Sequence, residues 1–123
     1  MALHIRANLE ALAAFLTGEA EVPFTINMAE VDPPGGMISL IGVEPYTMGL
    51  RAARVACYLI GPSRDEAIVF DILEPILDKC VEALDITGEI STVTIPVPGG
   101  GAPLPAFRFE TLIELQTPEE SET

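Results

Sequence analysis

A helix-period pattern of apolar residues runs from Ser63 to Asp85 and is the strongest signal in the chain. Apolar positions recur there three and four residues apart, so they share one face of a helix that turns by about 100° per residue. They are Val69, Leu73, Ile76, Cys80 and Leu84. Ser63 with Glu66 three residues later fits a capping box, which predicts the helix start. Pro75 costs about 3 kcal/mol in a straight helix, so we expect one kinked helix.

The opposite face of this expected helix is acidic along its whole length. Its carboxylates are Asp71, Glu74, Asp78, Glu82 and Asp85. Like charges at these spacings repel one another by roughly 0.2–0.5 kcal/mol per pair. Such a face is typical of a solvated surface that maintains solubility, or of a surface that must not bind a polyanion. A calcium site at Asp71, Glu74 and Asp78 is a remote alternative, because a row of carboxylates on a rigid helix cannot wrap around the ion.

Shorter patterns on either side predict one more helix and five strands. The N-terminal helix is expected from Leu3 to Thr17, with Gly18 as its C-terminal cap. Alternating or continuous apolar runs predict strands at Val22–Met28, Met37–Val43, Arg51–Ile60, Thr92–Val97 and Phe107–Leu115. The Met37–Val43 run is almost entirely apolar, so we expect both of its faces to be covered, by the domain or by a neighbouring subunit.

Glycine and proline mark the connections between these elements. The breakers from Asp32 to Gly36 predict a chain reversal. Pro45 and Gly49 predict a loop from Glu44 to Leu50. The connection PGGGAPLP at residues 98–105 is too long for a tight turn, so a protruding hairpin loop is expected.

The order helix, three strands, helix, two strands predicts an α+β fold. We expect a single two-layer domain, with a mostly antiparallel or mixed sheet of about five strands and both helices on one face. The domain should span residues 1–116. Residues 117–123 form an acidic segment with the composition of a disordered tail.

Composition narrows the classes of function. The chain has 123 residues with 19 acidic and six basic side chains, and a formal net charge of −13. This balance argues against binding a nucleic acid through a basic patch. No apolar run approaches the roughly 20 residues of a membrane span, and the N-terminus lacks the features of a secretory signal. Yet 49% of residues are hydrophobic, which indicates a rich core or apolar surface buried in partners.

The chain lacks the usual constellations of catalytic residues. His4 is the only histidine and has no Ser or Cys near it in sequence that would make a nucleophile and base pair. Gly99, Gly100 and Gly101 lack the Lys and Ser/Thr of a phosphate-binding loop. Cys57 and Cys80 fall on apolar faces, where reduced core cysteines are expected. We therefore expect no catalysis, cofactor or metal.

Several segments together resemble a known family. They are LHIRANLEALAAFL at residues 3–16, RVACYLIGP running into SRDEAIVFDILEPILDKCVEAL at residues 54–84, and VTIPVPGGGAPLPAFRFETLIEL at residues 93–115. In their order and style they resemble the tail terminator (tail completion) proteins of long-tailed bacteriophages, particularly phages of actinobacteria. The resemblance covers residues 3–116 and rests on the style of segments, including LPAFR at the start of the last strand.

This resemblance implies a structural virion protein. Members form a ring, usually of six copies, on the last ring of the tail tube at the end nearest the head. The implied partners are further copies of the chain, the major tail tube protein and the head-to-tail connector, while DNA passes through the ring without specific binding. Assembly would take place in the host cytoplasm, with no membrane involved.

The same hypothesis assigns roles to two groups of residues. Subunit or tube contacts are expected at the two loops, through Tyr46, Met48, Pro98, Gly99, Gly100, Gly101 and Pro103. The acidic row from Asp71 to Asp85 is a candidate lining for the lumen, where carboxylates repel phosphate over a Debye length of about 8 Å.

Three other functions stay open. The chain could be a head-to-tail connector of the phage neck, an adaptor or stopper. It could be a small α+β interaction module unrelated to phages, which binds a partner strand at the edge of Met37–Val43. A small enzyme or ligand-binding domain is the third, although it needs polar groups that converge on a pocket.

Overall fold

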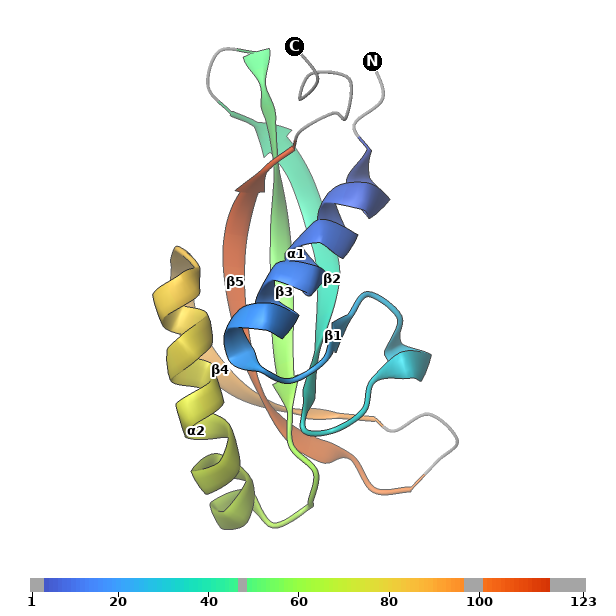
Figure 1. Cartoon of the computed structure of the whole chain (residues 1–123), viewed down its shortest axis with the longest axis vertical. Coiled ribbons are helices and arrows are strands. Elements are labelled where there is room, and N and C mark those ends of the chain that lie inside the picture. Colours follow the sequence, from blue (N-terminus) through green and yellow to red (C-terminus); the bar gives the residue numbers. More distant parts are fainter. Residues whose placement is uncertain (1–3, 47–48, 97–100, 116–123) are drawn as a thin grey trace.

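The computed structural model describes residues 4–46, 49–96 and 101–115, which form one α+β domain (Figure 1). The elements in chain order are α1 (Ile5–Ala20), β1 (Phe24–Thr25), the 3-10 turn η1 (Met28–Glu30), β2 (Gly35–Pro45), β3 (Arg51–Ile60), α2 (Glu66–Ala83), β4 (Ile86–Ile95) and β5 (Leu104–Glu114). The predicted α+β class, with two helices and five strands, is confirmed.

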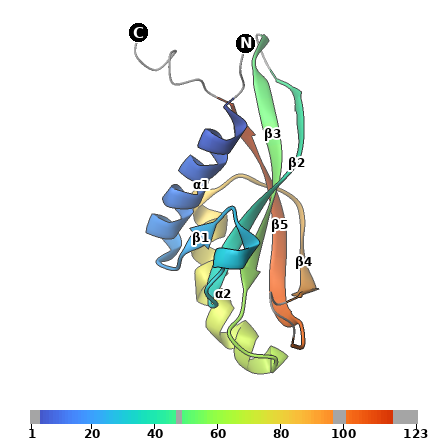
Figure 2. The same ribbon diagram turned by 90° about the vertical axis from the view of Figure 1, so that its right-hand side faces the viewer.

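The five strands form one mixed sheet in the order β1-β2-β3-β5-β4. β1 runs parallel to β2, and the other neighbouring pairs are antiparallel. Both helices lie on the same side of the sheet, as expected (Figure 2). The opposite side, called the open face below, has neither α1 nor α2 against it.

The core lies between the helices and the three central strands. Ile38, Cys57 and Phe109 are direct partners across β2, β3 and β5, so they form one row on the helix side. Completely buried members of this core are Leu16, Ala53, Val55, Cys57, Leu59, Val69, Leu73, Cys80 and Phe109. Ile76 and Leu84 pack partly buried against it, so the predicted core face of α2 is confirmed.

A second, smaller apolar cluster lies on the open face. It centres on Ile60, Ile95 and Ala106, where β3 and the β4–β5 hairpin meet. Met28 and Val31 pack against this cluster from the segment around η1. The cluster shows how η1 is attached to the sheet.

The ends of both helices differ from the prediction. α1 continues through Gly18 to Ala20, and Glu21 adopts the left-handed conformation at φ 61° that was expected of Gly18. α2 begins at Glu66, and its N-cap is Asp65, whose carboxylate accepts hydrogen bonds from the N–H groups of Ala67 and Ile68. The predicted Ser63–Glu66 capping box is therefore wrong. Ser63 instead accepts a hydrogen bond from the Asp65 N–H, 3.2 Å away. α2 is a single continuous helix through Pro75.

The predicted strand Val22–Met28 is mostly wrong, since only Phe24 and Thr25 pair with β2. Two contacts, one distant in sequence and one local, accompany its shortness. The Phe24 ring lies against Gly36, where any side chain would collide with it. The Asn27 side chain accepts a hydrogen bond from the Ala29 N–H at 3.1 Å and so caps η1, which ends the extended conformation.

β3 has the predicted bounds, while β2, β4 and β5 are longer than predicted. Gly35 and Gly36 belong to β2 and not to a turn, and β2 runs to Pro45, inside the predicted loop Glu44–Leu50. The hairpin continues beyond Pro45, because the Tyr46 N–H donates to the Leu50 carbonyl at 2.9 Å. β4 begins at Ile86, directly after α2, and its pairing with β5 is irregular between Thr87 and Ser91.

Candidate functional site

The outer edge of β2 is an apolar strand edge that the described part of the domain leaves uncovered. β1 pairs only with Gly36 and Met37, and no described strand pairs with the outer side of residues 38–45, called the β2 edge below. Leu40, Ile41 and Val43 are 37%, 47% and 36% exposed. The described part of the domain therefore does not cover this run, and cover by a neighbouring subunit, the other alternative in the prediction, stays a prediction.

Backbone groups on the β2 edge face outward in a definite order. Just before this edge, the Gly36 N–H points outward, away from β3, and donates to the Pro23 carbonyl. Because backbone N–H groups alternate in direction along a strand, the N–H groups of Ile38 and Leu40 also point outward. The Tyr46 N–H points inward and donates to the Leu50 carbonyl. By the same alternation, the N–H group of Val43 points outward. The register shift between Leu40 and Gly42 marks a β-bulge at Ile41 that joins the two halves.

The β2–β3 hairpin extends past the N-terminal end of α1 (Figure 1). Tyr46, predicted to contact a neighbour, lies at this end and is 48% exposed, while Met48 lies outside the described residues. Gly49 adopts φ 78°, a left-handed conformation that glycine tolerates best. The end of the hairpin therefore presents an aromatic side chain beside the apolar β2 edge.

The β4–β5 hairpin was predicted to supply the other contact segment. Ile95 pairs with Leu104, so the two strands form the expected hairpin. Gly101 and Pro103 are exposed, and Gly101 adopts φ 99°. Pro98, Gly99 and Gly100 lie outside the described residues. Figure 1 places the connected ends of β4 and β5 and those of β2 and β3 toward opposite ends of the long axis, so the described parts of the two predicted contact segments lie apart.

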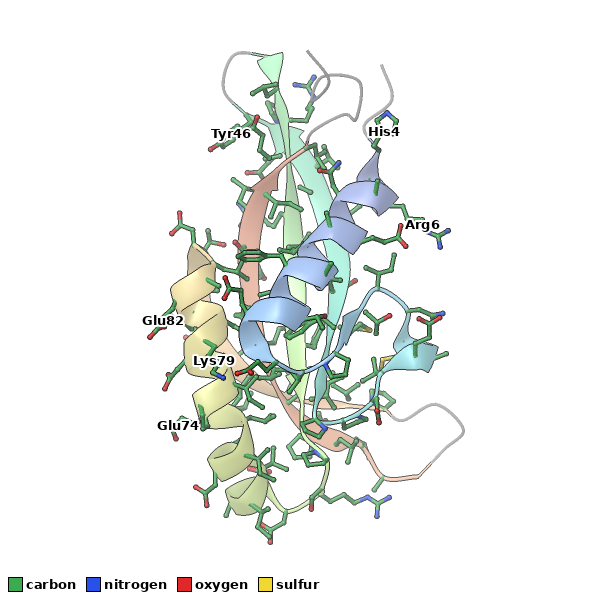
Figure 3. All side chains as sticks on the ribbon, viewed as in Figure 1. His4, Arg6, Tyr46, Glu74, Lys79 and Glu82 are labelled. Carbon is green, nitrogen blue, oxygen red and sulfur yellow. The ribbon has the colours of Figure 1, made fainter. Side chains whose placement is uncertain are left out.

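The acidic row on α2 faces solvent, as predicted from its position opposite the core face. Asp71, Glu74, Asp78 and Glu82 are all exposed on α2, and Asp85 is exposed just after it. Figure 3 shows Glu74 and Glu82 pointing away from the sheet.

Lys79 is the only basic residue of α2 and bridges the two helices. Its Nζ lies 2.6 Å from a carboxylate oxygen of Glu21. The hydrogen bond and the charge of Lys79 lower the pKa of Glu21. Lys79 is therefore engaged with α1, and it leaves the acidic row without a base of its own.

A set of ion pairs on the open face was not predicted. Arg54 lies between two carboxylates, 3.3 Å from Glu44 and 3.8 Å from Glu110. Arg108 lies 2.8 Å from Glu110 and donates to the Tyr58 hydroxyl at 3.3 Å. The hydrogen bonds with Tyr58 and then with Glu110 raise the pKa of Arg108. Only the strand register brings these residues together, so composition and spacing gave no sign of the cluster.

The two cysteines are buried in the core. Burial, with a smaller contribution from Cys80, raises the pKa of the Cys57 thiol to about 12. Burial raises the pKa of Cys80 to about 11. Since the thiolate is the nucleophile, neither group is prepared to attack a substrate at neutral pH.

These thiols give a simple chemical prediction. We expect iodoacetamide at pH 8 to leave both cysteines of the folded protein unmodified, and to alkylate both in strong denaturant. Intact-protein mass spectrometry would measure the difference. Rapid alkylation of the folded chain would contradict the described burial of Cys57 and Cys80.

Other candidate sites gain no support. Among the described residues, no group of three His, Cys, Asp or Glu side chains is arranged to hold a metal ion, so Asp71, Glu74 and Asp78 do not form the calcium site considered above. His4 lies at the start of α1. A groove of about 370 Å³ between α1 and β1 is lined in part by Arg6, Glu10, Asn27 and Glu30. This lining includes no Ser, Cys or His.

Neither helix in the described part of the chain has the length and apolar character to cross a membrane. Comparisons with protein-family models, curated proteins and solved structures find no match to this chain. The β2 edge with its adjoining hairpin is the candidate functional site, because it combines an unpaired strand edge with exposed apolar side chains.

Proposed function

We propose that the chain is a structural protein that assembles into a ring of six copies and caps the tail tube of a bacteriophage. The observation that carries the proposal is the β2 edge, an apolar strip that the domain itself leaves uncovered. Monomeric proteins usually protect such edges, because exposed strands pair with other chains. An uncovered edge beside a complete core favours a protein that works as an oligomer.

The proposal that this oligomer is a tail terminator ring rests on the resemblance of the sequence to that family. The order of elements that carries the resemblance, helix, strands, long helix and closing hairpin, agrees with the order in the fold. The head-to-tail connector of the phage neck remains the second candidate, because it too is a small ring-forming protein.

The charge distribution suits a ring around DNA. Carboxylates cover the outward side of α2, and the basic residues of the open face are paired with acids. Such surfaces offer few free cations to phosphate, so DNA can pass without being retained. In this proposal the acidic row faces the lumen, and the tail tube protein and the connector bind the two sides of the ring.

Tube elongation tests the proposal. Purified tail tube protein should polymerise into tubes of shorter and more uniform length when this chain is added early, because capped ends stop growing. Adding the chain after elongation is complete should leave the length unchanged. Tubes that grow equally long in both cases would contradict the function.

A further inference from the structure

We propose that the β2 edge of one copy pairs in antiparallel fashion with the outer edge of β4 of the next copy, so that the sheet continues from subunit to subunit. The inference rests on the ring proposed above and names the contact between neighbouring subunits, called the joint below. It uses two edges of one sheet, since β2 beyond Met37 and β4 each have a described partner strand on one side only.

Strand direction permits the joint. β2, β3, β5 and β4 alternate in direction, because each neighbouring pair is antiparallel. β2 and β4 therefore run in opposite directions within one copy. When the next copy continues the sheet in the same orientation, its β4 lies antiparallel to β2, and the alternation is preserved. The joint uses different surfaces on the two copies, which is the arrangement that closes into a ring.

The two edge strands also carry few charged residues, although the chain as a whole is strongly acidic. The β2 edge contains one charged residue, Glu44, which is already paired with Arg54. β4 contains one, Glu89, in the irregular segment between Thr87 and Ser91. In a chain of net charge −13, these strips can meet with little repulsion between copies.

The β2 edge offers both polar and apolar contacts to a partner strand. The N–H groups of Ile38, Leu40 and Val43 face outward, while Leu40, Ile41 and Val43 expose apolar side chains. Pro45 also lies on the outward side, where it has no N–H to donate, so pairing should end there. On β4, Ile90 is 38% exposed and would be covered by the joint.

Single lysine substitutions test each half of the joint. Ile41→Lys should prevent pairing through the β2 edge, and Ile90→Lys should prevent pairing through β4. Each substitution places a charge on a surface that is removed from water when the joint forms. Ile68→Lys is the matched control, since Ile68 is 51% exposed on α2 and belongs to neither edge strand. Particle mass by light scattering should fall to one subunit for the two edge variants and stay at the wild-type value for the control. Val43→Lys should repeat the loss, and unchanged circular dichroism would show that each variant folds.

Mixing the two edge variants gives the decisive result. Ile41→Lys retains a sound β4, and Ile90→Lys retains a sound β2, so an equal mixture should form particles of two chains that neither variant forms alone. Two-chain particles from Ile90→Lys alone would overturn the proposal, because β2 would then pair with β2 of another copy. Wild-type-sized particles from Ile41→Lys, or a wild-type chain that stays monomeric at every concentration, would overturn it as well.

The same variants separate this inference from the proposed function. If Ile41→Lys still caps tail tubes, the joint is wrong and the function stands. If the mixture forms two-chain particles but wild-type protein does not stop tube growth, the joint stands and the function is wrong.

Discussion

Phe109→Ala should lower the free energy of unfolding by about 3–5 kcal/mol, the usual cost of removing a large buried aromatic side chain. Phe109 has no exposed surface and is the largest of the fully buried side chains. It lies beside Cys57 in the row that faces both helices. Because domains of this size are stable by about 5–15 kcal/mol, the loss would remove much of the total.

Phe15→Ala is the matched control for this prediction. Phe15 is 45% exposed on α1, and alanine has the higher helix propensity, so the change should stay within about 0.5 kcal/mol. Urea unfolding of both variants, under conditions where the chain is monomeric, would give the two free energies. Similar losses at the two positions would contradict the described core.

Assembly should strengthen as salt rises from about 0.01 M to about 0.15 M, over which the Debye length falls from about 30 Å to about 8 Å. Copies of a chain with net charge −13 repel one another, and salt screens this repulsion. Four of the six basic residues already form ion pairs within their own chain: Arg6, Arg54, Lys79 and Arg108. Few bases are left to join one copy to another.

Sedimentation velocity at several salt concentrations would measure this dependence. The fraction of oligomer should increase through the range at fixed protein concentration. A fraction that decreases would indicate an assembly held by ion pairs, and it would contradict a joint made of apolar and uncharged strands.

Periodic patterns were enough to predict the central part of this fold. The three-and-four spacing from Val69 to Cys80 identified the core face of α2, because a helix converts that spacing into one side. Alternation in Arg51–Ile60 likewise predicted β3 with its bounds. These elements are set by local sequence, and their burial follows from it.

Features that depend on contacts distant in sequence were not predicted. The strand around Phe24 was cut short by the packing of its ring on Gly36, which no local pattern records. For the apolar run in β2, the sequence left open whether the domain or a neighbouring subunit covers it, because an interior strand and an apolar edge strand have the same composition. The ion pairs of Arg54 with Glu44 and Glu110 form only in the observed register of β2, β3 and β5, which the sequence does not reveal.

Electron microscopy of tail tubes grown with this chain tests the central claim most directly. We predict a ring of extra density at one end of each tube, the end at which growth has stopped. The Ile68→Lys control should give the same ring. Bare tube ends in the presence of excess wild-type chain would contradict the account.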